Sequence, residues 1–266
     1  MVRGVDVKFI NPGAEEMIRQ ILEFQTPETS AWWSSPLYHF YPQLDQEYAQ
    51  GLAFPERMAY LEQMLQKIYE EQRAVIDQKA KQYADHWTVC RGQITEALSE
   101  AFEVDLTNQF QDLRCLVSLN PVEPRFLQER SFSVFYLNSE RGAIGEAIHE
   151  MVHFVWFYVW HQVFGDRVEE YERPSTKWIL SEMVVESVMR DPRLSSINPY
   201  FPRENGGCIY PWFFDMIAGG KPILETLDPW YRSMGIRDFM KKSYEYCLEH
   251  EDEIRGHMNR AETAEI

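Results

Sequence analysis

The chain has 266 residues, a formal net charge of −16, and 45% hydrophobic and 14% aromatic residues. This composition is that of a folded globular protein with a sizeable core, which excludes an intrinsically disordered chain. The excess of acidic residues argues against nucleic acid or an anionic membrane as the main partner. Since a core of this size needs no disulfides and no C-x-x-C pair is present, we expect free thiols at Cys90, Cys115, Cys208 and Cys247.

Residues 1–110 are predicted to form a mainly helical N-terminal region. A short helix is expected from Ala14 to Phe24. Apolar residues at steps of three and four then predict a long helix from about Pro55 to Trp87. A break at Arg91-Gly92 should separate it from a second helix, Ile94 to Phe102.

Residues 111–266 are predicted to combine a small sheet with further helices, either as a second region or as part of one continuous domain. Leu113–Leu119 and Arg130–Leu137 have the composition of strands, and the second alternates so that one face is partly polar. A helix should begin at Asn138 or Ser139 and end near Gly165. The chain as a whole therefore indicates a helix-dominated α+β fold.

The helix that follows the strands contains the pattern H-E-x-x-H at His149, Glu150 and His153. Histidines four residues apart project from one face of a helix and can hold one Zn²⁺ at about 2.0–2.1 Å. Glu150 lies about 100° round the helix, where it can act on a water molecule without binding the metal. Because the continuation Phe154–Trp160 is apolar almost all round, this helix should be buried, and its histidines and acids (with Glu146) then need a partner such as a divalent cation.

A second apolar helix is predicted from Thr176 to Met189, and it carries Glu182 and Glu186 four residues apart on one face. Little of its circumference is polar, so at least one of these glutamates should point inward. Beyond it we expect a loop marked by Pro192, Pro199, Pro202 and Gly206-Gly207, and then helices at Pro211–Ala218, Pro222–Arg232 and Ile236 to about His257.

The patterns His149-Glu150-x-x-His153 and Trp178-Ile179-Leu180-Ser181-Glu182-x-x-x-Glu186 together resemble the two signature helices of the gluzincin metallopeptidases, the thermolysin-like group. The resemblance extends from Phe132 to Met189, with Met183 and Val185 standing where the family context often has Gly and Ala. It implies a zincin-like core in which a small sheet lies beside the metal helix.

Carried over by position, the resemblance implies one zinc ion per chain, bound by His149, His153 and Glu182. Glu150 would be the general base, and Glu186 would be an acid outside the ligand set that orients one of the imidazoles. Three protein ligands leave a fourth position open, which is the arrangement of a catalytic zinc site.

The activity implied is that of a zinc-dependent peptidase acting on a peptide or protein substrate. Glu150 would take a proton from a zinc-activated water molecule and pass it to the leaving amine. A peptide is expected to lie as an added strand along Ser133–Leu137. Residues that could stabilise the oxyanion are Tyr200, Tyr210, Tyr231, His250 and His257.

Two other classes of protein are compatible with these patterns. A catalytically inactive zincin-fold protein would bind metal, or a partner, without hydrolysis. A carboxylate-bridged di-iron protein would use Glu146-x-x-His149 and Glu150-x-x-His153, but such proteins place this motif on two different helices. Since the sequence shows no secretory signal and no apolar run long enough to span a bilayer, we expect a cytoplasmic protein without a membrane partner; its oligomeric state is left open.

Overall fold

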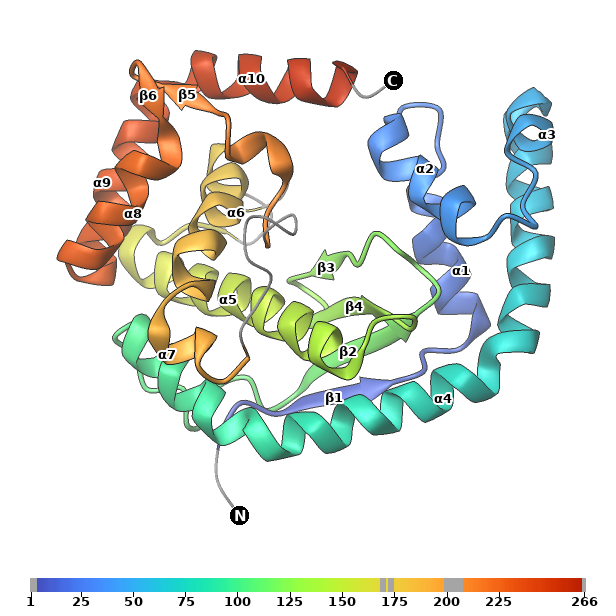
Figure 1. The fold of residues 1–266 in the computed structure, drawn as a ribbon, viewed down its shortest axis with the longest axis horizontal. Coiled ribbons are helices and arrows are strands. Elements are labelled where there is room, and N and C mark those ends of the chain that lie inside the picture. Colours follow the sequence, from blue (N-terminus) through green and yellow to red (C-terminus); the bar gives the residue numbers. More distant parts are fainter. Residues whose placement is uncertain (1–3, 168–170, 172–174, 199–207, 265–266) are drawn as a thin grey trace. The chain divides into compact units, whose positions relative to one another are not determined.

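The computed structural model describes residues 4–167, 171, 175–198 and 208–264. It has the expected helix-dominated α+β composition, with a small sheet among many helices (Figure 1). The chain divides into two compact units whose stretches alternate along the sequence. One unit comprises Met1–Asp6, Trp87–Gln111 and Ile144–Ala261, and the other comprises Val7–His86, Asp112–Ala143 and Glu262–Ile266.

The second of these units contains a four-stranded mixed sheet of order β1-β2-β4-β3. Strands β1 (Val7–Ile10), β2 (Leu113–Ser118) and β4 (Ser131–Phe135) run parallel, whereas the two-residue β3 (Arg125–Phe126) pairs with β4 in the antiparallel sense. The prediction of β2 and β4 is confirmed. Neither β1 nor β3 was predicted, although Val7 and Phe9 are buried on either side of exposed Lys8, which is the alternation of a strand.

The face of β4 that we expected to be partly polar is buried. Ser131 and Ser133 have no exposed surface, and the Ser133 hydroxyl donates a 3.2 Å hydrogen bond to the side-chain oxygen of Gln20. Gln20 lies on α1 (Ala14–Glu23), the short helix predicted from the sequence. The alternation therefore reflects a buried polar contact between helix and strand and not a solvent-facing surface.

The edge of β4 that faces away from β2 already has hydrogen-bond partners from its own chain. The Ser133 N–H donates to the Pro124 carbonyl, and the Phe135 N–H donates to the Glu123 carboxylate. A peptide added along Ser133–Leu137, as expected from the sequence, would have to displace both contacts.

A single helix, α4 (Phe54–Ala101), replaces the two helices and the break predicted at Arg91-Gly92. A glycine in a helix costs only about 1 kcal/mol relative to alanine. Contacts on both sides of Gly92 offset this cost: the Arg91 guanidinium bonds Asp6, and the Thr95 hydroxyl donates to the Arg91 carbonyl. Two shorter helices, α2 (Ala31–Phe40) and α3 (Gln46–Gly51), precede α4.

The metal-motif helix α5 (Glu140–Phe164) begins and ends as the sequence predicts. The Ser139 hydroxyl accepts the Gly142 N–H and so caps its first turn. At the other end Gly165 takes a φ of 71°, and its N–H bonds the His161 carbonyl. Helix α6 (Thr176–Met189) is capped in turn by Ser175, whose hydroxyl accepts the Trp178 N–H.

The C-terminal part differs from its prediction in two places. Pro211–Ala218 is a 3₁₀ turn, η3 (Pro211–Phe213), followed by a hairpin of β5 (Ile217–Ala218) and β6 (Lys221–Pro222) around Gly219-Gly220. Both glycines have positive φ, 59° and 79°, which a two-residue hairpin turn needs. The last predicted helix is divided at His250 into α9 (Ile236–Glu249) and α10 (Glu251–Ala264).

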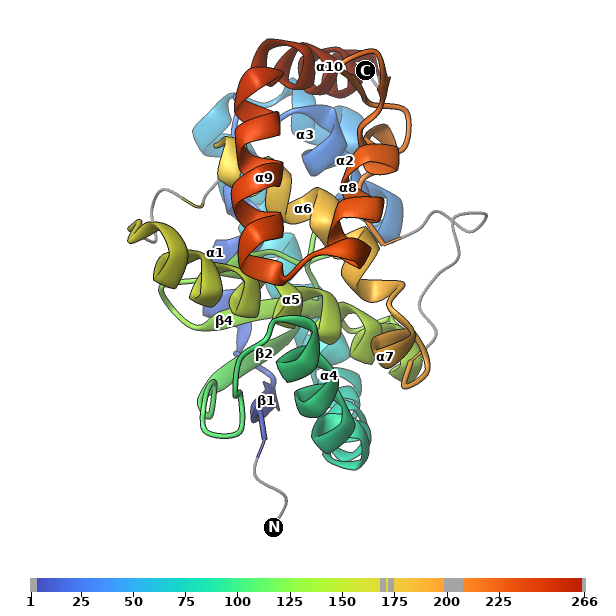
Figure 2. The ribbon, with the colours of Figure 1, turned by 90° about the vertical axis from the view of Figure 1, so that its left-hand side faces the viewer.

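Helix α6 packs against α8 (Ile223–Ser233) and α9, and the short α7 (Pro192–Ser195) follows it in the chain (Figure 2). The loop residues Pro199, Pro202 and Gly206-Gly207 lie outside the described residues. All four cysteines are buried free thiols. None of the described helices has the length and apolar character that a membrane crossing requires.

Candidate metal centre

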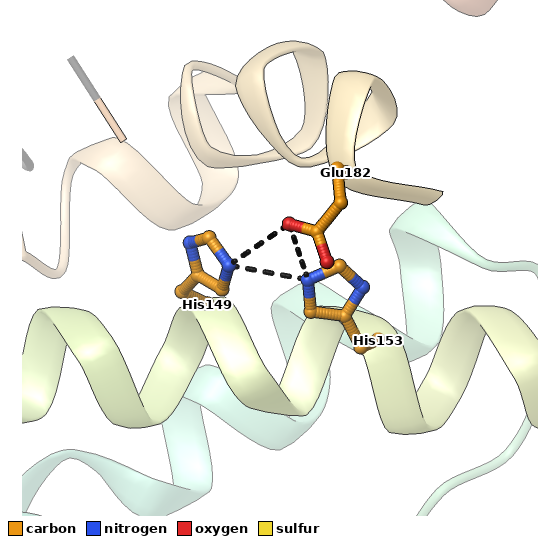
Figure 3. Close-up of side chains that lie close together, drawn as sticks. All are labelled: His149, His153 and Glu182. Carbon is orange, nitrogen blue, oxygen red and sulfur yellow. Dashed lines mark hydrogen bonds and ion pairs between the residues drawn. The ribbon is translucent and has the colours of Figure 1, made fainter. Parts of the chain in front are cut away.

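Two helices of one unit bring the predicted metal ligands together (Figure 3). His149 and His153 project from adjacent turns of α5, and Glu182 projects from α6 towards them. This meeting depends on the i, i+4 spacing of the histidines, which places both imidazoles on one face of α5. Among the described residues, these three are the group whose His and carboxylate ligand atoms all lie within 4.8 Å of one another.

The three ligand atoms form a triangle of the size that zinc requires. The two Nε2 atoms are 3.1 Å apart, and Oε2 of Glu182 is 3.9 Å from Nε2 of His149 and 3.4 Å from Nε2 of His153. Atoms held about 2.0–2.1 Å from a tetrahedral zinc are about 3.3 Å from one another. A triangle with these sides has a point about 2.0 Å from all three corners. The three atoms therefore lie close enough together for one metal ion to contact all of them.

The group is largely buried, and His149 is its most exposed member. The side chains of His153 and Glu182 are 0% and 5% exposed, while that of His149 retains 12%. A buried carboxylate and two convergent imidazole nitrogens are costly unless something positive lies between them. A divalent cation would offset this cost for all three at once.

Glu150 lies next to this group but not in it. It follows His149 on α5 and is 7% exposed, so it is a buried carboxylate outside the ligand triangle. This is the location expected of a general base. That role stays a prediction, because it concerns a reaction and not a contact.

Glu186 is as deeply buried as Glu182, at 3% and 4% exposed, so both glutamates of α6 point inward. One oxygen of Glu186 lies 3.4 Å from the Arg190 guanidinium, and the other accepts the Cys208 thiol at 3.2 Å. The expected role of Glu186 in orienting an imidazole stays a prediction. Sequence reasoning missed these two contacts of Glu186. The i, i+4 spacing from Glu186 to Arg190 was available as a signal, whereas Cys208, 22 residues away, left none.

The environment of Cys208 keeps its sulfur protonated. Burial, followed by the charge of Glu186 and its hydrogen bond, raises the pKa of this thiol well above the usual range, and Glu146 adds to the shift. The S–H is therefore the donor and the carboxylate the acceptor.

The structure does not single out one of the residues proposed to stabilise an oxyanion. The Tyr231 hydroxyl donates to Asp191 at 3.3 Å, and His250 Nδ1 lies 2.8 Å from Glu253. The ring of Tyr210 stacks on Trp212 with centroids 4.8 Å apart. His257 lies on α10, and Tyr200 falls outside the described residues.

Comparison of the chain with protein-family models, curated proteins and solved structures gives no match. The resemblance to the gluzincins therefore stays a prediction from the residues of α5 and α6.

Proposed function

We propose that this protein is a zinc-dependent peptidase with one zinc site per chain. The observation that carries the proposal is the convergence of His149, His153 and Glu182 from two helices at 3.1–3.9 Å in a buried group. These residue types at these distances match a three-ligand zinc site, which leaves a coordination position for chemistry. The neighbouring Glu150 is a buried carboxylate outside the ligand set. A structural zinc site does not need such a residue, whereas a catalytic site does.

Each residue then has a defined task. His149, His153 and Glu182 would hold the ion, and bound zinc would supply Lewis-acid chemistry by acidifying water and polarising a carbonyl. Glu150 would take the proton of the attacking water and return it to the leaving amine. The burial of Glu150 and Glu182 lowers the local dielectric, which strengthens each of these charge interactions.

The test compares zinc-loaded wild type with Glu150→Gln on a mixed peptide library. The amide is close to isosteric with the carboxylate and cannot accept a proton, so zinc content should stay at one per chain. Hydrolysis should fall by roughly 10²–10⁴-fold, the contribution typical of a general base. As a matched control, Glu140→Gln removes a half-exposed carboxylate from the first turn of the same helix and should hydrolyse at the wild-type rate.

The outcomes distinguish a zinc peptidase from a non-catalytic metal-binding protein. Equal hydrolysis by wild type and Glu150→Gln would contradict the assigned mechanism. Zinc binding without hydrolysis of any peptide would favour a non-catalytic metal-binding or interaction protein. Wild type without bound zinc would contradict both.

A further inference from the structure

Cys208 belongs to neither α5 nor α6, yet its thiol contacts the carboxylate of Glu186, one helical turn from Glu182. Its sulfur lies 3.2 Å from Oε2 of Glu186, and the other oxygen of Glu186 faces the Arg190 guanidinium at 3.4 Å. Cys208 is 8% exposed and Glu186 is 3% exposed. The buried carboxylate is thus held from two directions, by a neutral donor and by a cation.

The chain around Cys208 runs along the row of α6 side chains that includes the metal ligand. Trp178, Glu182 and Glu186 are spaced by four residues and so form one row on the helix. Tyr210 packs on Trp178 with ring centroids 6.1 Å apart, one turn before Glu182, while Cys208 contacts Glu186 one turn after it. The segment from Cys208 to Tyr210 therefore passes the level of Glu182.

The state of the thiol determines what kind of role it can have. Because its pKa is raised, Cys208 is not the thiolate that a nucleophile or a redox sensor requires. It is instead a hydrogen-bond donor to the Glu186 carboxylate, 3.2 Å away. A donor fixes the orientation of its acceptor, and here the acceptor is a carboxylate one helical turn from a metal ligand.

We infer that Cys208 is a positioning residue of the metal site, whose thiol holds the Glu186 carboxylate beside Glu182 and thereby strengthens zinc binding. This inference rests on the metal site of the proposed function but not on peptide hydrolysis. A fixed negative charge near the site favours a bound cation, and partners outside the ligand set are part of what sets metal affinity.

The test measures zinc dissociation constants by chelator competition for Cys208→Ala and Cys208→Ser. Alanine removes the donor, so zinc should bind roughly tenfold more weakly, the lower end of the effects of such outer partners. Serine retains a donor and should restore most of the affinity. The absorption spectrum of the Co²⁺-loaded protein should change in the alanine variant, because it reports ligand geometry directly.

Cys247 provides a matched control within the same compact unit. It is a fully buried free thiol on α9, and burial alone raises its pKa to about 12. Cys247→Ala should therefore lower the melting temperature of the metal-free protein, as any cavity does, while leaving zinc affinity unchanged. A comparable loss of zinc affinity in the Cys247 and Cys208 variants would overturn the inference.

A double-mutant cycle keeps the inference testable even where Cys208→Ala is unstable. If the thiol acts through Glu186, adding Cys208→Ser or Cys208→Ala to Glu186→Gln should change zinc affinity little further. Full additivity, or wild-type affinity in Cys208→Ala, would overturn the inference. If the variants bind zinc in the expected order of affinity but no peptide is cleaved, the inference is supported and the peptidase activity is contradicted. If the wild type does not bind zinc, both the inference and the proposed function are overturned.

Discussion

At the scale of single residues, the site is defined by three atoms that can each donate a lone pair to a metal ion. The Nε2 atoms of His149 and His153 are 3.1 Å apart, and a buried carboxylate oxygen of Glu182 faces them both. One proton can bridge only one pair of these atoms at a time. A dication at the centre satisfies the three together, and this is the physical reason for preferring a metal site to a cluster of buried ion pairs.

The two glutamates of α6 should differ in their effect on zinc. Glu182→Gln replaces a charged ligand oxygen by a neutral amide and should remove most zinc at micromolar free metal. Glu186→Gln leaves the triangle intact and should weaken binding only about 10–100-fold, as changes outside the ligand set do. Zinc stoichiometry after dialysis against a graded series of chelators measures both.

Arg190→Gln is a useful companion to these variants. It removes a guanidinium that contacts Glu186, and the Arg190 side chain is 50% exposed. It should have a smaller effect than Glu186→Gln. If Glu186→Gln lost its zinc while Glu182→Gln kept it, the two glutamates would have been assigned in reverse.

At the scale of elements, much of α5 and α6 could be predicted because their signals are local. Serines before each helix, Gly165 after α5 and the near-absence of polar positions determine where these helices lie and how deeply they are buried. Helix caps and apolar periodicity depend on residues that are close together in the chain, so both can be recognised from the sequence alone.

The wrong predictions concern places where distant contacts override a local signal. Gly92 predicted a break in α4, but the bonds of Arg91 and Thr95 to the N-terminal segment keep the helix continuous. The contact of Cys208 with Glu186 was equally inaccessible, since it depends on a tertiary approach across 22 residues and not on spacing. The hairpin at Gly219-Gly220, in contrast, had a local signal. The predicted helices stop before these two glycines and resume after them, but the glycine pair was not recognised as a hairpin turn.

The N-cap of α6 should contribute measurably to the stability of the helix that carries Glu182. The Ser175 hydroxyl accepts the Trp178 N–H at 3.2 Å, and loss of such a cap costs about 1 kcal/mol. Ser175→Ala should lower the free energy of unfolding by this amount in denaturant titrations. Ser175→Asp retains an acceptor and should stay near wild type; equal losses in the two variants would show that the cap contributes nothing.

At the scale of the whole molecule, the ligands tie together parts of the chain that are distant in sequence. His153 and Glu182 are separated by 29 positions, and both belong to the compact unit that contains most of the C-terminal half. An ion that binds this arrangement, and not the unfolded chain, must stabilise it by mass action. Metal binding should therefore be measurable as an increase in the free energy of unfolding, without the use of a substrate.

Zinc should raise the melting temperature, and chelation should lower it. At free zinc about 100 times the dissociation constant, the stabilisation is about 2.7 kcal/mol, which corresponds to roughly 5–10 °C for a chain of this size. Calorimetry measures the shift, and hydrogen exchange should locate the added protection in peptides from α5 and α6. A variant with both His149→Ala and His153→Ala should show neither effect. If it responded to zinc as the wild type does, the ion would be bound elsewhere, and the triangle of His149, His153 and Glu182 would not be the site.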